Sequence, residues 1–347
     1  MNKDKQKESE FLTKVKGGHF NFSYSSLNRL RFSPSLFYKD YILLDREVRT
    51  DKHLIEGRLV HLLLLQPDVF DEQFILLPGK TPSDAVRRVL NEVKDNLPGI
   101  RNSGDPEVEQ NYEEPKLDRL QPEIIAALKH QNLYQSIKSD QKKYEKIATI
   151  DNQDYFTFLC SADGKDIIDQ DTFDNCEHRV NLIKENESIM KLLDVEVTDF
   201  ELDSVEVHTE KMLSCKLDSF DFGLKGIIDR YMVDHEKKLI TIIDIKTTSK
   251  SIIDFADTVE FYNYWLQAAI YTMLVVKNLE EKAQDYKISF NFIVTDRYNQ
   301  IYNFEVRPNT LNEWGMKLRD NLNVAKYHVD NMNFDLPYEF LTNKVSL

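Results

Sequence analysis

Residues 226–248 read GIIDRYMVDHEKKLITIIDIKTT. Two runs rich in β-branched residues flank the polar segment DHEKK, which is the pattern of a β-hairpin. With the turn centred on Glu236 and Lys237, antiparallel pairing places Asp229 directly opposite Asp244. Side chains in such a pair lie about 4.5–5.5 Å apart at Cβ. The stretch therefore predicts a hairpin that brings two carboxylates together among apolar residues.

An amine accompanies these two acids. Asp244 and Lys246 are two residues apart and share a strand face, whereas Ile243 and Ile245 point the other way. Two neighbouring carboxylates in an apolar setting repel each other and lose solvation, and a divalent cation is the simplest compensation. Their oxygens suit Mg²⁺, with Mn²⁺ as a substitute. The alternative is a surface hairpin whose acids pair with nearby basic side chains, and a register slip of one residue would separate the aspartates.

The order G-x-x-D then D-x-K-T-T, between Gly226 and Thr248, resembles the catalytic core of PD-(D/E)xK nucleases, in particular the RecB-like branch. That branch carries a Q-x-x-x-Y helix after the lysine. Gln267 and Tyr271 match this pattern and share one helical face. A core helix with incidental polar groups is the alternative for this pair.

The resemblance implies a fold and a set of site residues. The expected fold is α/β: a restriction-endonuclease-like core with a central mixed β-sheet flanked by helices, plus helical additions. The implied catalytic residues are Asp229, Asp244, Lys246, Gln267 and Tyr271. The implied metal ligands are His61, Asp229, Asp244, the backbone carbonyl of Ile245, and Glu210.

His61 and Glu210 enter this set from outside the hairpin. The segment EGRLVHLLLLQPDVF, residues 56–70, resembles the G-x-x-x-H-x-x-x-L-x-P-x-x-F segment of the exonuclease VIII-like (RecE-type) phage recombination exonucleases, whose histidine joins the metal site. The preceding S-x-S-x-L-x-x-L-x-x-S-P stretch, from Ser23 to Pro34, also fits that family. An acid often precedes the G-x-x-D strand in this branch. Glu210 is the first candidate for it and Glu206 the second.

The remaining patterns divide the chain into a leader, one domain and a tail. Strands are expected in three β-branched runs after residue 200 and in two more around DRYNQ. Helices are expected from a cap at Ser25 or Ser26, from Ser33-Pro34, and through residues 53–66. Further helices are expected from Thr81 to Val93, over 122–147, 171–193 and 259–279, and from Asn309 or Thr310 to Val329, with a loop over 98–120. The predicted division is a flexible leader at 1–18, a single nuclease domain at 19–335 with core segments 53–78 and 200–306 and a helical and loop insertion at about 85–150, and a tail at 336–347.

Composition excludes several classes of protein. The 347 residues are 41% hydrophobic, but no apolar run is long enough for a membrane span. The three cysteines form no C-x-x-C pair, so reduced thiols in a cytoplasmic protein are expected. A net charge of −14 argues against a nucleic-acid coat protein, but a nuclease needs positive charge only along its DNA track. Without a G-x-x-x-x-G-K-[ST] loop, its activity should not need ATP.

These features lead to a metal-dependent deoxyribonuclease. The family resemblance implies an ATP-independent 5′-to-3′ exonuclease that acts on double-stranded DNA ends in phage-type recombination. It also implies a ring-like homo-oligomer, an annealing protein for the single strand as partner, and a phage or prophage origin in the cytoplasm of a bacterial host. Two alternatives stay open: a structure-specific, repair or defence endonuclease with the same core, and a non-catalytic DNA-binding module on a nuclease fold.

Overall fold

The structure is a computed structural model that describes residues 3–46, 51–97, 115–162, 164–193, 204–279, 285–342 and 344–345. Its contacts divide the chain into two compact units, one formed by Met1–Leu65 with Cys176–Leu347 and the other by Gln66–Asn175. All three cysteines are free thiols. Within the described ranges, no helix combines the length and apolar character needed to cross a membrane.

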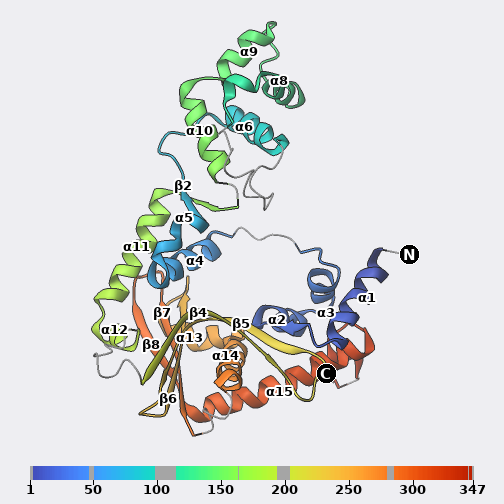
Figure 1. Cartoon of the computed structure of the whole chain (residues 1–347), viewed down its shortest axis with the longest axis vertical. Helices are drawn as coiled ribbons and strands as arrows, with labels where there is room; N and C mark the ends of the chain where they lie inside the picture. The colour runs from blue at the N-terminus through green and yellow to red at the C-terminus, as the bar shows by residue number, and fades with distance from the viewer. Residues whose placement is uncertain are drawn as a thin grey trace. The chain divides into compact units, whose positions relative to one another are not determined.

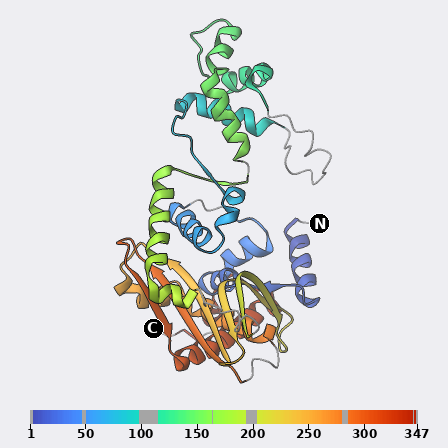
Figure 2. The ribbon, with the colours of Figure 1, turned by 60° about the vertical axis from the view of Figure 1, so that its left-hand side comes forward.

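A mixed six-stranded sheet forms the centre of the first unit, and its strands lie side by side in Figures 1 and 2. The antiparallel neighbours are β4 (Val205–Lys216), β5 (Gly223–Asp234) and β6 (Leu239–Thr247). Strand β7 (Lys287–Thr295) runs parallel to β6, β8 (Ile301–Val306) pairs antiparallel with β7, and short β1 (Asn21–Phe22) pairs parallel with the start of β5. The predicted mixed sheet and hairpin register are therefore confirmed.

Helices cover the sheet because β6 is apolar on both faces. Ile242 and Ile243 of this strand are both fully buried although they point to opposite sides. Helix α14 (Tyr264–Leu279) lies against the sheet, and α15 (Pro308–Asn331) packs along α14 (Figure 1). Helix α4 (Lys52–Leu65) contacts β6. Further short elements of this unit are α3 (Pro34–Phe37), the π-helix Tyr38–Ile42, the 3₁₀ turn Ile252–Asp254, α12 (Glu187–Leu193) and α16 (Tyr338–Leu341).

The helix predicted over 259–279 is two helices. Helix α13 (Phe255–Phe261) ends before Asn263, whose φ of 58° lies in the left-handed region, and α14 begins at Tyr264. Asparagine tolerates this conformation better than most residues. Its side chain donates to Asn28 at 2.8 Å and accepts from the indole nitrogen of Trp265 at 3.1 Å. These bonds hold the break, which the apolar pattern of the sequence conceals.

The N-terminal residues form a helix instead of the flexible leader that their charge suggested. Helix α1 (Lys3–Lys16) buries Phe11 and Val15, four residues apart on one face, in the main core. Tyr38 donates a hydrogen bond of 2.6 Å to Glu8 of this helix. Because only two of its residues are apolar and buried, the charged remainder dominated the sequence pattern.

Helix α2 (Tyr24–Phe32) begins earlier than its predicted cap. Ser23 is the N-cap, and its side chain accepts a hydrogen bond from the backbone N–H of Ser26. In return, the hydroxyl of Ser26 accepts a 2.8 Å hydrogen bond from the backbone N–H of Ser23. This reciprocal arrangement is a capping box, so the predicted capping serine at 26 is its third helical residue. The cap predicted at Ser33 is confirmed.

The second unit has its own apolar cluster, formed mainly by four helices: α6 (Asp84–Asn96), α8 (Gln121–His130), α9 (Asp140–Ile147) and α10 (Ile150–Ser161). It also holds the parallel pair β2 (Phe74–Leu76) and β3 (Asp166–Ile168), α5 (Phe70–Gln73), and the 3₁₀ turns Pro67–Val69 and Leu117–Arg119. Helix α11 (Gln170–Glu185) begins here and continues into the first unit. The unit spans Gln66–Asn175 and so includes more residues at both ends than the predicted insertion at 85–150.

Two predictions within this unit need correction, and one helix was missed. The cap of α6 is Ser83, not Thr81. The helix predicted over 122–147 is interrupted between α8 and α9, where Asn132 adopts a φ of 54°. Helix α10 was not predicted at all. Of the loop predicted over 98–120, residues 98–114 lie outside the described residues.

The glycine that opens the G-x-x-D pattern allows α14 to approach β5. A Cβ atom at Gly226 would lie 3.0 Å from Cε1 of Tyr271 and 3.1 Å from Cδ1 of Leu274. We therefore expect Gly226→Ala to lower the free energy of unfolding by about 1–3 kcal/mol because of overpacking, as measured by urea denaturation. In Gly315→Ala, on α15, the added methyl meets nothing within 4 Å. This control should gain up to about 1 kcal/mol from helix propensity. An unchanged stability of Gly226→Ala would contradict the close approach of Tyr271.

Candidate active site

Three carboxylates occupy matching positions on three neighbouring strands. The pairs on either side of Glu210 place this residue of β4 opposite Asp229 of β5. The ladder between β5 and β6 keeps the predicted register as far as Arg230 and Ile243, and Asp229 and Asp244 follow directly beyond its last pair. The sheet therefore concentrates negative charge where β5 and β6 begin to separate.

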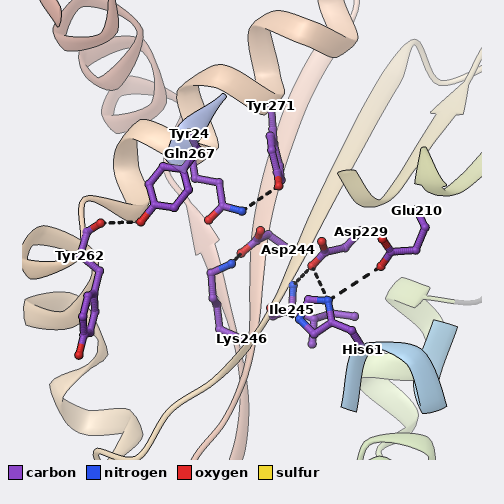
Figure 3. A network of polar contacts seen from close by, with 10 residues as sticks. All are labelled: Tyr24, His61, Glu210, Asp229, Asp244, Ile245, Lys246, Tyr262, Gln267 and Tyr271. Atoms are coloured by element: carbon purple, nitrogen blue, oxygen red, sulfur yellow. Dashed lines mark hydrogen bonds and ion pairs between the residues drawn. The ribbon is translucent and has the colours of Figure 1, made fainter. Parts of the chain in front are cut away.

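A histidine from α4 completes a group of possible metal ligands. One donor atom each from His61, Glu210 and Asp229 lies within 4.8 Å of the others. The Nδ1 atom of His61 is 3.5 Å from Asp229 Oδ2 and 3.9 Å from Glu210 Oε1 (Figure 3). Its Nε2 atom donates a 2.7 Å hydrogen bond to the backbone carbonyl of Ile245. This bond orients the ring so that Nδ1 faces both acids, as outer partners of metal-binding histidines commonly do.

The donor set fits a hard divalent cation. Burial alone would lower the pKa of His61, but the carboxylate of Asp229 and the bond to Glu210 outweigh it and raise this pKa to about 9. The site thus attracts positive charge strongly, and in the absence of a metal the imidazolium supplies it. Two carboxylate oxygens and one imidazole nitrogen are ligands that Mg²⁺ and Mn²⁺ accept.

Asp229 is fixed by the backbone of the neighbouring strand. Its Oδ2 accepts a 2.7 Å hydrogen bond from the N–H of Ile245, at the point where the regular ladder has ended (Figure 3). The side chain is only 9% exposed. This bond uses one carboxylate oxygen, so Asp229 keeps its second oxygen for another ligand.

Asp244 and Lys246 form a separate ion pair beside this group. The Lys246 ammonium nitrogen is 2.5 Å from Asp244 Oδ2, and the Asp244 side chain is completely buried (Figure 3). Burial raises the pKa of Asp244, and Lys246 opposes that shift. Burial lowers the pKa of Lys246, but Asp244 and Asp229 more than reverse it. The structure therefore places Asp244 next to the lysine, outside the His61, Glu210 and Asp229 group.

The predicted Q-x-x-x-Y pair lies over the same acids. Gln267 Nε2 donates to the hydroxyl of Tyr271 at 2.8 Å, and both side chains are buried (Figure 3). Burial together with the charges of Asp244 and Asp229 raises the pKa of Tyr271 well above its ordinary value. The phenol therefore stays protonated at neutral pH.

The second candidate acid lies in a different network. Glu206 accepts hydrogen bonds from His235 Nε2 at 3.0 Å and from His208 Nε2 at 3.4 Å. The hydrogen bond from His235 lowers the pKa of Glu206, although burial opposes this shift. Of the two acids that the sequence offered on this strand, Glu210 is thus the one near His61.

Two neighbours of the site were not predicted. The ring of Tyr264 lies 4.9 Å from the Lys246 ammonium, as a cation–π contact. Asp296 is completely buried and accepts backbone N–H bonds from Tyr298, Gln300 and Ile252, so it ties the segment after Lys246 to the turn before β8. The sequence signals the second of these, because an aspartate that opens a turn commonly accepts backbone N–H groups. No sequence signal marks Tyr264.

Glu210 has a strained backbone. Its φ of 47° lies in the left-handed region although it stands within β4. Such a conformation costs on the order of 1–3 kcal/mol for a residue with a Cβ, and strain of this kind clusters at functional sites. Here it belongs to the acid that faces His61.

Replacement by glycine tests this strain. Glycine adopts positive φ without steric cost, so Glu210→Gly relieves the strain, whereas glycine at a regular strand position is destabilising. Lys211→Gly, at the next and regularly paired position, is the matched control. In EDTA, we expect Glu210→Gly to unfold with a free energy at least about 1 kcal/mol above that of Lys211→Gly. Equal losses in urea denaturation would show that the backbone at 210 is not strained.

A comparison with protein families matches the part of the chain that contains the three strands of the site. Residues 175–335 match the family model described as PD-(D/E)XK nuclease superfamily. The comparison with curated proteins gave no match. Among solved structures, a "Putative exonuclease" from Eubacterium rectale is similar, with a TM-score of 0.44 and 13% identity over 97% of this chain and 91% of that chain. The mixed sheet flanked by helices is consistent with the superfamily fold. Residues 175–335 are thus similar to PD-(D/E)XK nucleases.

Proposed function

We propose that this protein is a divalent-metal-dependent nuclease that hydrolyses the phosphodiester bonds of DNA. The carrying observation is the convergence of His61, Glu210 and Asp229 within 4.8 Å, directly beside the buried pair of Asp244 and Lys246. A cation site next to a buried lysine brings together two positive groups that can stabilise the negative charge formed in phosphodiester hydrolysis. The family match over residues 175–335 supports the same reaction class.

Each side chain has a distinct part in this proposal. His61, Glu210 and Asp229 hold the cation, with Asp244 and the carbonyl of Ile245 next to them as the further ligands that the family resemblance implies. A bound Mg²⁺ or Mn²⁺ would polarise a phosphate oxygen, lower the pKa of a water molecule and offset developing charge. Lys246, protonated beside its two aspartates, orients the attacking water and stabilises the negative charge that builds on phosphate.

Gln267 and Tyr271 complete the proposed site from α14. The tyrosine, protonated and hydrogen-bonded to Gln267, faces the charge of both aspartates. Its proton is therefore available for a hydrogen bond to a carboxylate or to a DNA phosphate. In this proposal the pair positions the site and the DNA backbone and takes no part in bond breaking.

The finer assignment is an exonuclease. We propose ATP-independent 5′-to-3′ digestion of one strand from double-stranded ends, with Mg²⁺ as the physiological metal. The support is the resemblance of residues 23–34 and 57–70 to phage recombination exonucleases. The same resemblance supports a homo-oligomer, an annealing protein as partner, and a phage or prophage origin in the bacterial cytoplasm.

The test is digestion of a linear duplex labelled at either its 5′ or its 3′ end, with Mg²⁺, Mn²⁺ or EDTA and without ATP. We expect metal-dependent loss of label from one end only, and an intact covalently closed circle. Lys246→Met should lower the rate about a hundredfold or more, because it removes charge stabilisation of the transition state. Lys238→Met removes an exposed lysine at the turn end of the same hairpin and should leave the rate unchanged.

The other outcomes separate the alternatives. Cutting of the closed circle would replace the exonuclease with an endonuclease of the same core. An intact protein that cuts none of these substrates with any metal, but still binds them, would contradict the nuclease and favour a DNA-binding module.

A further inference from the structure

A chain of aromatic rings leads from the buried lysine to the protein surface. The ring of Tyr264 lies 4.9 Å from the Lys246 ammonium and stacks on Tyr262 with centroids 5.7 Å apart. Tyr262 contacts Phe261 edge to face at 4.9 Å, and the ammonium of Lys250 lies 5.2 Å from the Phe261 ring. The chain therefore has a cation at its buried end and another at its outer end.

The outer rings of this chain are exposed although their backbone is held firmly. Phe261 is 71% exposed and Tyr262 is 45% exposed. The carbonyl oxygen of Tyr262 accepts hydrogen bonds from the Tyr24 hydroxyl at 2.6 Å and from the Asn28 side chain at 3.3 Å. In Figure 3 the ring of Tyr262 points away from Tyr24. Two large aromatic rings thus face solvent on a fixed backbone. Burying their apolar surface against a partner would lower the free energy, which favours a binding site here.

The chemistry of this surface selects one kind of partner. Aromatic side chains bind nucleobases by stacking, and neighbouring cations bind the phosphates that link those bases. Bases inside a duplex already stack on both faces, so this surface favours bases outside the duplex, such as those of a single-stranded or frayed end. Continuity with Lys246 places the rings next to the proposed point of cleavage.

We propose that Phe261 and Tyr262 form a stacking platform for unpaired bases of the DNA strand at the active site, with Lys250 binding an adjacent phosphate. This inference rests on the proposed nuclease function and specifies its substrate: a strand whose bases are unpaired next to the cleaved bond. The platform would stabilise a frayed or single-stranded end relative to continuous duplex, which gives the site a physical reason to prefer ends.

The test is binding of a fluorescein-labelled single-stranded oligonucleotide in EDTA, which prevents cleavage, followed by fluorescence anisotropy. Phe261→Ala and Phe261→Leu should weaken binding about five- to a hundredfold, because both remove the ring and the leucine keeps the apolar bulk. Phe261→Trp keeps a stacking ring and should bind like the native protein. Phe340→Ala is the control: it removes a ring on α16 that is 54% exposed. No described ring contact joins Phe340 to Phe261, Tyr262 or Tyr264, so binding should be unchanged.

Two further readouts distinguish stacking from a general loss of affinity. A 2-aminopurine base in the oligonucleotide should lose fluorescence on binding to the native protein and not to Phe261→Leu. Lys250→Gln should lower the slope of log K against log salt by about 0.7, the value for one phosphate contact on a single strand. A relaxed, covalently closed circular duplex has neither an end nor unpaired bases, and it should bind equally to native protein and Phe261→Leu.

The outcomes separate this inference from the function on which it rests. If the native protein digests DNA and binds the single strand, but Phe261→Leu binds it equally well, the platform is overturned and the nuclease stands. Equal weakening of the closed duplex by Phe261→Leu would also overturn the platform. A native protein that neither cleaves nor binds DNA would overturn both.

Discussion

The site depends on the cost of burying the Asp244 carboxylate. This group has no exposed surface, and the ammonium of Lys246 lies 2.5 Å from it. An unpaired buried carboxylate would be strongly destabilising, so the lysine is a requirement of the fold as well as a candidate for catalysis. Glu210 and Asp229 add two carboxylates nearby, and His61 adds one positive charge when it is protonated. A divalent cation in place of that proton would neutralise the three acids and the lysine as a set.

The separation of β5 and β6 turns a regular ladder into a binding site. Beyond the last pair of that ladder, the N–H and the carbonyl of Ile245 bond to side chains instead of to the backbone of β5. Asp229 accepts the N–H and His61 donates to the carbonyl, so the two side chains are clamped to one peptide segment between Asp244 and Lys246. This explains how a histidine far away in sequence reaches the hairpin.

The sequence was informative where one short pattern contained the geometry. The hairpin register follows from two β-branched runs and one turn, the mixed sheet follows from the family resemblance, and both agree with the structure. It was uninformative where a few side chains decide the outcome. Asn263 breaks a continuous apolar helix pattern, and Phe11 anchors a helix that is otherwise charged. Spacing placed Asp244 opposite Asp229, but it did not show that the lysine pairs with Asp244 while His61 and Glu210 gather around Asp229.

The most direct test of this account is a crystal of the full chain soaked with Mn²⁺, with an anomalous difference map calculated at the manganese absorption edge. We expect a peak bound by Asp229, with His61 and Glu210 as neighbouring ligands, and loss of that peak in Glu210→Gln. A Glu206→Gln crystal should keep the peak, because Glu206 is engaged with His208 and His235 instead. An anomalous map with no peak among these three residues in the native protein would contradict the central claim that they form a metal site.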